Sequence, residues 1–183
     1  ALPLQQWVMA RHKDGSVKWL GLASTISPGN TQGLKVSMQP LPRKNQRKKA
    51  ATATEAGNVR VSEGNDEIVV ENGVETVRFA KKGSKLIKSI GMGGEEVAGE
   101  GRLVCIREDI SKESAGVFYL HDYQSKLENV TVEKNGPVLA VVKMEGKHSD
   151  GKRDWLPFSV RFYVYSDVPG IRMVHSIVYD GEQ

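Results

Sequence analysis

Residues able to bind a carboxylate and to move a proton gather towards the end of the sequence. Arg161 and Tyr163 belong to one predicted strand, and Arg172, His175 and Tyr179 belong to the next. The planar guanidinium of arginine matches a carboxylate, and histidine or tyrosine can accept a proton. Together such side chains could neutralise a carboxylate and remove the proton on the carbon beside it.

The two-residue repeat of a strand divides these candidates between opposite faces of a sheet. His175 and Tyr179 share one face of their strand, whereas Arg172 lies on the other face. Arg161 and Tyr163 share a face of the neighbouring strand and could meet either group across a hairpin. In the alternative interpretation, all five are polar partners on a sandwich strand, with tyrosine rings buried and hydroxyls in water.

The other histidines carry weaker indications of chemistry. His121 lies in the stretch FYLHDYQ, where tyrosine and aspartate neighbours could orient the imidazole. His12 lies beside a hairpin turn and His148 beside SDGKRD, so we predict that both are solvated loop residues. The glycine-rich run at residues 91–94 is followed by two glutamates and no helical pattern, which argues against a phosphate cradle.

The three tryptophans, Trp7, Trp19 and Trp155, are candidates for stacking on sugar rings. The first two lie on the apolar arms of WVMARHKDGSVKWLGLAST, around an Asp14-Gly15 pair that favours a type I′ hairpin turn. Because both arms are otherwise apolar, we predict that Trp7 and Trp19 pack on one face of a sheet rather than bind sugar.

Composition argues against several classes of protein. No apolar run approaches the roughly 18–20 residues of a membrane-spanning helix, so no membrane partner is expected. Cys105 is the only cysteine, and no Cys/His cluster has zinc-ligand spacing, so we expect no metal or other cofactor. Five of the 26 basic residues lie at positions 43–49, and without them 21 basic residues stand against 22 acidic ones. No aromatic residue is interleaved in this run, so we expect a solvated linker and no nucleic-acid partner.

The hydrophobic pattern predicts an all-β protein. Residues 158–165 alternate apolar and polar side chains, as a pleated strand does. Residues 138–143 and 171–179 are apolar on both faces, which is typical of interior strands. Asn72-Gly73 and Pro169-Gly170 are turn signals between predicted strands.

A change in composition divides the chain into two parts. Residues 1–39 hold the opening hairpin and a predicted third strand near residues 34–38, and a stretch without strand pattern follows. We therefore predict the end of a small barrel-like β domain plus linker at residues 1–50, and an antiparallel β-sandwich domain at residues 58–183. Both ends of the chain look like cuts, so we expect both domains to be incomplete.

Three stretches of the sequence resemble the exo-rhamnogalacturonan lyase family, the YetA-like polysaccharide lyases. The stretches are LPLQQWVMARHKDGSVKWLGLAS, YLHDYQSKLENVTVEKNGPVLAVVKMEGKH and WLPFSVRFYVYSDVPGIRMVHSIVYDGE. They match ordered motifs of the family over nearly the whole chain. The long basic linker and His121 depart from the family pattern.

The resemblance implies a protein that cleaves rhamnogalacturonan-type pectin by β-elimination. An arginine would neutralise the uronate carboxylate, and a base would take the C5 proton; His175, Arg172, Arg161, Tyr163 and His121 are the candidates. Family members carry a barrel-like β domain, a central β-sandwich and an α/α toroid. The toroid lies outside this sequence, and we expect these β domains to pack against it and to be inactive alone.

The resemblance also implies a periplasmic or extracellular protein that acts on a polysaccharide. The alternative is a non-catalytic module that binds carbohydrate or only supports the sandwich.

Overall fold

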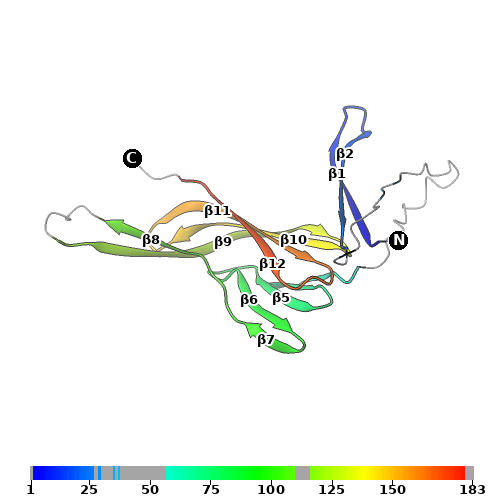
Figure 1. The fold of residues 1–183 in the computed structure, drawn as a ribbon. Coiled ribbons are helices and arrows are strands. Elements are labelled where there is room, and N and C mark those ends of the chain that lie inside the picture. Colours follow the sequence, from blue (N-terminus) through cyan, green and yellow to red (C-terminus); the bar gives the residue numbers. More distant parts are fainter. Residues whose placement is uncertain are drawn as a thin grey trace.

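The computed structural model describes residues 2–26, 29, 35, 37, 57–109 and 116–179. This part of the chain forms twelve strands in three antiparallel sheets, a hairpin and two five-stranded sheets (Figure 1). In each sheet the strands that are adjacent in the sequence also pair with each other. The all-β, antiparallel fold is as predicted. Within these residues no helix has the length and apolarity to cross a membrane.

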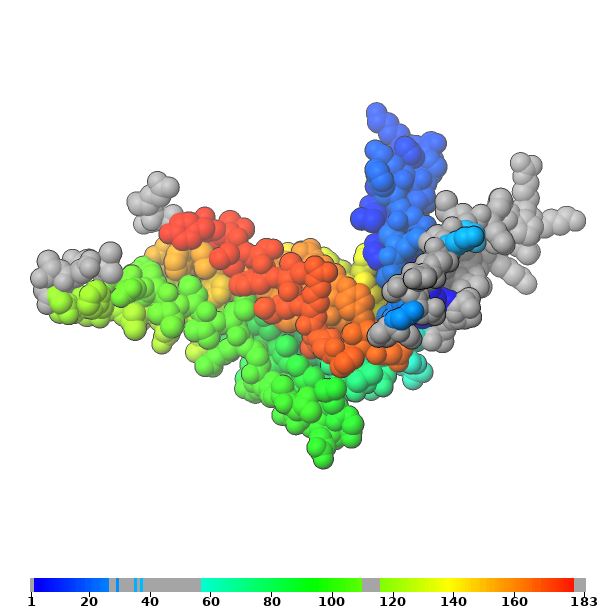
Figure 2. All heavy atoms as spheres, viewed as in Figure 1, coloured from blue at the N-terminus to red at the C-terminus, as the bar shows by residue number. Residues whose placement is uncertain are grey.

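The opening hairpin consists of β1 (Leu4–Arg11) and β2 (Val17–Ser24). It projects from the body of the molecule, on the side away from the smaller of the two five-stranded sheets (Figures 1 and 2). Its turn differs from the predicted type I′, because Gly15 has a φ of +84° while Asp14 has no positive φ. Instead, Asp14 stabilises the turn by accepting a 2.9 Å hydrogen bond from the Ser16 backbone N–H.

The side chain of Gln5 fastens the hairpin to the sandwich. Its Nε2 donates to the Leu139 carbonyl (2.9 Å), and its Oε1 accepts from the backbone N–H groups of Val138 (3.1 Å) and Leu139 (2.7 Å). The fit requires Gly136, since a Cβ at that position would lie 2.3 Å from Gln5 Cδ. The buried Gln5 amide therefore replaces backbone pairing at this junction.

The small sheet has the order β3-β4-β5-β6-β7. Its strands are β3 (Arg60–Glu63), β4 (Glu67–Glu71), β5 (Glu75–Ala80), β6 (Ile87–Met92) and β7 (Glu95–Ala98). The predicted turn at Asn72-Gly73 joins β4 to β5. Gly93 and Gly94 have φ values of +60° and +88° and form the tight turn between β6 and β7. Two positive φ values explain the glycine-rich run.

The large sheet has the order β12-β11-β10-β9-β8. Its strands are β8 (Val104–Asp109), β9 (Tyr119–Asn135), β10 (Leu139–Ser149), β11 (Asp154–Tyr165) and β12 (Ile171–Ile177). β10 is interior, as predicted. The prediction for residues 171–179 is wrong, because β12 lies at the sheet edge of the described residues and leaves Met173 and Ile177 more than half exposed.

The core lies between the inner faces of the two five-stranded sheets. The small sheet contributes side chains such as Ile68 and Phe79, and the large sheet contributes Val142, Val160 and Phe162. The rings of Phe79 and Phe162 meet across the layers with centroids 5.1 Å apart. Alternation in β10 and β11 therefore places every second residue in this core and the residues between them on the outer face.

Asn72 joins one end of the small sheet to the turn between β11 and β12. It is fully buried, and its Nδ2 donates to the carbonyls of Tyr165 and Val168, each at 2.9 Å. Its Oδ1 accepts from the backbone N–H groups of Val74 (3.0 Å) and Glu75 (2.8 Å). One amide thus satisfies four backbone groups from the two sheets.

Several predictions fall outside the described residues. They are the strand near residues 34–38 and the solvated linker at residues 43–49. The domain boundaries at residues 50 and 58 also stay predictions.

Candidate functional site

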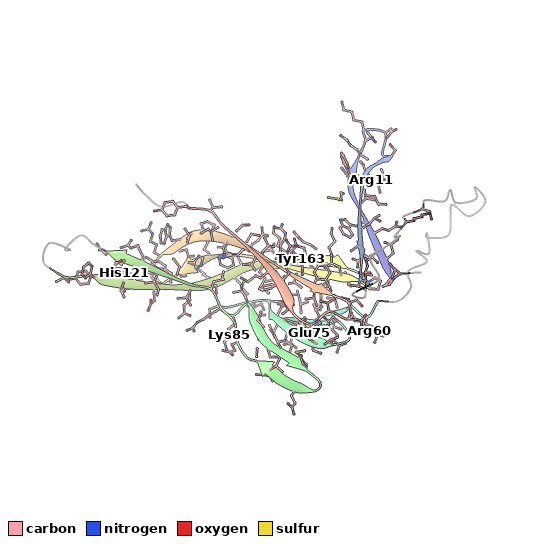
Figure 3. All side chains as sticks on the ribbon, in the orientation of Figure 1. Arg11, Arg60, Glu75, Lys85, His121 and Tyr163 are labelled. Atoms are coloured by element: carbon pink, nitrogen blue, oxygen red, sulfur yellow. The ribbon has the colours of Figure 1, made fainter. Side chains whose placement is uncertain are left out.

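The outer face of the large sheet brings together three of the five residues predicted to do chemistry. The strand register aligns Lys134, Val141, Tyr163 and Arg172 in one row across β9, β10, β11 and β12. The guanidinium of Arg172 lies over the Tyr163 ring, 5.5 Å from its centroid. Arg161 precedes Tyr163, which Figure 3 labels, by two residues of β11 and therefore shares its face. We call this set Lys134–Val141–Tyr163–Arg172 the outer-face row.

Arg161 already holds a carboxylate of the protein. Its Nε and Nη2 donate to the two oxygens of Glu133 at 2.8 and 2.9 Å. These hydrogen bonds hold the pKa of Glu133 below its ordinary value and raise that of Arg161. Arg161 would have to release Glu133 before its guanidinium fork could bind a substrate carboxylate.

The other end of the outer-face row meets the opening hairpin at Trp7. The Lys134 ammonium lies 5.1 Å from the centroid of the indole. The ring also covers Gly21 of the paired strand, where a Cβ would lie 2.3 Å from Trp7 Cε2. A recess of about 320 Å³ opens at this junction. It is lined by Gln5, Gln6, Trp7, Glu133, Lys134, Asn135, Gly136 and Pro137.

The packing prediction holds for Trp7 and is wrong for Trp19. Trp7 is half-buried between the hairpin and Lys134, whereas Trp19 is 61% exposed and Met9 67%. The reason is that the hairpin leaves the sandwich beyond Trp7 and has an irregular register at Met9. Among the described residues, none buries the side chain of Trp19.

His175 lies on the opposite, inner face of the large sheet. It pairs with the core residue Val160, and its ring centroid is 6.3 Å from that of Phe158. Partial burial lowers the pKa of His175, and a charge on His148 would lower it further. His175 and Arg172 therefore face away from each other, as the alternation of the strand predicts.

His148 is not the solvated loop residue that we predict from the sequence. It lies in β10 and is 2% exposed. Its Nδ1 is 2.8 Å from the Leu156 carbonyl, and its ring centroid is 5.2 Å from that of Phe158. The prediction fails because β10 continues one residue beyond His148, to Ser149, and the turn begins only after that.

Trp155 belongs to an aromatic cluster with Tyr123 and Tyr179. Its ring centroid lies 5.7 Å from Tyr123 and 6.2 Å from Tyr179, both edge to face. The guanidinium of Arg153 lies 5.7 Å from the centroid of the indole. These contacts give Trp155 a packing role, although its Nε1 is buried with no hydrogen-bond partner among the described residues.

His121 lies far from the other candidates. It is on the β8–β9 hairpin, paired in register with Arg107. Figure 3 shows it at the end of the large sheet that lies away from Tyr163 and from the opening hairpin, where Arg11 is labelled. The five catalytic candidates therefore divide into three separate places in the fold: the outer face with Arg161, Tyr163 and Arg172, the inner face with His175, and the β8–β9 hairpin with His121.

The outer face does not combine Arg172 with a histidine, because His175 lies on the inner face. Arg172 lies over the ring of Tyr163, which is the geometry of a cation–π pair. Among the described residues, no group of three histidine, cysteine, aspartate or glutamate side chains could hold a metal ion.

Glu133 and Lys134 are site residues that the sequence reasoning missed. Both lie where the pairing of β9 with β10 shifts register, between Val141 and Val142. This irregularity places Glu133 beside Arg161 and Lys134 in the outer-face row. The nearby signal in the sequence is the Asn135-Gly136 turn, which locates the end of the strand but not its register.

Comparison with known proteins supports the resemblance noted above. Residues 59–183 match the family model of the PcRGLX-like protein central beta sandwich domain, and residues 1–39 match that of the PcRGLX-like N-terminal RIFT barrel domain. The chain is also 31% identical over 170 residues to the uncharacterized protein YetA of Bacillus subtilis (strain 168).

That alignment covers 91% of this chain and 19% of YetA, so the chain spans about a fifth of the length of this relative. The prediction of a β-sandwich preceded by part of a barrel domain is confirmed. By its central sandwich and its first residues, the chain belongs to the PcRGLX-like family of rhamnogalacturonan-lyase-like proteins.

Proposed function

We propose that this chain is the β portion of a polysaccharide lyase that cleaves rhamnogalacturonan-type pectin by β-elimination. In this proposal the chain is inactive without an α/α toroid that packs against it. The protein acts in the periplasm or outside the cell, where the polymer is accessible. Membership of a family of rhamnogalacturonan-lyase-like proteins supports the substrate class.

The observation that carries the proposed inactivity of this chain alone is the separation of Arg172 from His175. Elimination from a uronate needs a cation at the carboxylate and a base at the C5 proton, both within reach of one sugar ring. Arg172 and His175 lie on opposite faces of β12, and Arg161 is bound to Glu133. The proposal therefore assigns the missing part of the catalytic group to the toroid.

The test compares residues 1–183 with the longer protein encoded in the same reading frame. Both are incubated with rhamnogalacturonan, and the unsaturated product is followed by its ultraviolet absorbance. We expect no product from residues 1–183 and steady turnover by the longer protein. Turnover by residues 1–183 at the rate of the longer protein would refute the requirement for the toroid.

A non-catalytic carbohydrate-binding or supporting module is the second candidate function. The two cation–aromatic pairs of the outer face favour it, since they can hold an acidic sugar without any base. If the longer protein binds the polymer and forms no unsaturated product, this second function replaces the first.

A further inference from the structure

Two cations that form no ion pair among the described residues lie at opposite ends of the outer-face row. We propose that this row binds an acidic oligosaccharide, with one carboxylate at Lys134 and another at Arg172. The identity of the sugar as a uronate rests on the proposed function. The existence of an anion-binding row rests on the geometry alone.

The charges next to the row are already neutralised. Arg161 is bound in two hydrogen bonds to Glu133, and Lys143 forms an ion pair with Glu145. Lys134 and Arg172 form no ion pair among the described residues, although both lie on the same face as these pairs. A bound carboxylate would therefore find these two cations available without breaking a salt bridge.

Aromatic rings hold both cations in place. Lys134 lies over the half-buried indole of Trp7, and Arg172 lies over the half-buried ring of Tyr163. Trp7 is itself fixed by its contact with Gly21. Because the cations are positioned before a ligand arrives, binding loses less side-chain entropy than it would with free lysine and arginine chains.

The spacing of the cations sets the size of the ligand. Lys134 and Arg172 are separated by three strand intervals of about 4.8 Å, so their backbones lie roughly 14 Å apart. A single monosaccharide cannot reach both. The ligand is therefore an extended chain with at least two acidic groups, crossing β10 and β11 past the half-buried ring of Tyr163.

The recess beside Trp7 offers a place for one end of this chain. Its lining includes the amides of Gln6 and Asn135 together with Lys134. Amide and ammonium groups are suited to hydroxyls and carboxylates of a sugar. The row thus runs from a polar recess at the hairpin to the exposed Arg172 at the edge strand.

The test measures binding of oligogalacturonate to residues 1–183 by calorimetry. Lys134→Gln and Arg172→Gln are each expected to raise Kd about tenfold, as loss of one charge-assisted contact does. Lys134→Arg keeps the charge and should retain most of the affinity. Binding should weaken with salt and vanish for the carboxyl-reduced oligosaccharide.

Matched controls are Lys82→Gln and Arg60→Gln. Lys82 is paired with Asp66, and Arg60 lies on the small sheet. Each of these substitutions therefore removes one positive charge at a position outside the outer-face row. Circular dichroism checks that each variant is folded. Equal losses in the controls, unchanged affinity in both row variants, or no binding by the unaltered chain would each overturn the proposal.

This outcome is separable from that of the lyase assay. Charge-dependent binding at the row without turnover by the longer protein contradicts the proposed function and leaves the binding site standing. Turnover by the longer protein with unchanged affinity in the row variants contradicts the binding site alone.

Discussion

Arg172 and His175 lie three positions apart on β12 and face opposite sides of the large sheet. Arg172 is paired with Tyr163 on the outer face, and His175 is paired with the core residue Val160 on the inner face. In a regular strand, two side chains an odd number of positions apart always face opposite sides of the sheet. Two side chains that look adjacent in the sequence therefore cannot serve one sugar ring.

Replacing Asn72 should destabilise the sandwich strongly. Asn72→Ala removes four hydrogen bonds to backbone groups of two separate turns, so the free energy of unfolding should fall by about 3 kcal/mol or more. Urea unfolding measures this loss. The control Asn129→Ala removes one exposed bond to Glu145 and should change stability by less than about 0.5 kcal/mol. Equal effects of the two changes would contradict the role given to Asn72.

Replacing Gln5 should loosen the opening hairpin without unfolding the two five-stranded sheets. Gln5→Ala leaves the N–H groups of Val138 and Leu139 without their partner, at a cost of about 1–3 kcal/mol. Hydrogen exchange of these two amides should become faster, while that of the Phe162 amide in β11 should not change. The exposed neighbour Gln6 provides the control, since Gln6→Ala should leave all three amides as they are. Unchanged exchange at Val138 and Leu139 would count against the anchor.

The ion pair of Glu133 with Arg161 should stabilise the folded chain at neutral pH and lose this effect in acid. Because the folded pKa of Glu133 lies below its ordinary 4.5, the contribution is present above 4.5 and is lost as pH falls through the folded pKa. Both side chains are about a third exposed, so Glu133→Gln should cost about 1 kcal/mol or less at neutral pH. Urea unfolding of the two proteins should converge in acid, and a difference independent of pH would contradict this account.

His175 should titrate below its ordinary pKa of 6.5 in the folded protein. The contribution of its neutral form to stability is then present above pH 6.5 and is lost as pH falls through the folded pKa. Nuclear magnetic resonance of the imidazole should give a lower pKa in the folded chain than in the same chain unfolded in urea. His175→Gln should flatten the decrease of stability in this pH range. An equal pKa in both states would show that packing against Phe158 does not desolvate the ring.

Local patterns predicted strands such as β11 and the turn at Asn72-Gly73, although not the type of the opening turn or the end of β10. The alternation of residues 158–165 depends only on the pleat, and β11 follows it residue by residue. The Asn72-Gly73 turn likewise depends only on the residues that form it. The position of β12 could not be predicted in this way, because an apolar pattern on both faces shows that a strand favours burial and does not show which segment covers it.

The candidate site was predicted less well, because it depends on register. Arg161, Tyr163 and Arg172 do share one face, and antiparallel pairing across a short turn brings Arg172 to Tyr163. Glu133 and Lys134 come to them only through a register shift between β9 and β10. A shift of one residue reverses the face of every side chain beyond it, and single-sequence patterns do not reveal where it occurs.

The measurement that tests the account most directly is the formation of unsaturated product from rhamnogalacturonan by residues 1–183 alone. The separation of Arg172 from His175 predicts no increase in ultraviolet absorbance from this chain, and turnover when the longer protein of the same reading frame is used. Product formed by residues 1–183 and abolished by either Arg172→Gln or His175→Gln would contradict the account.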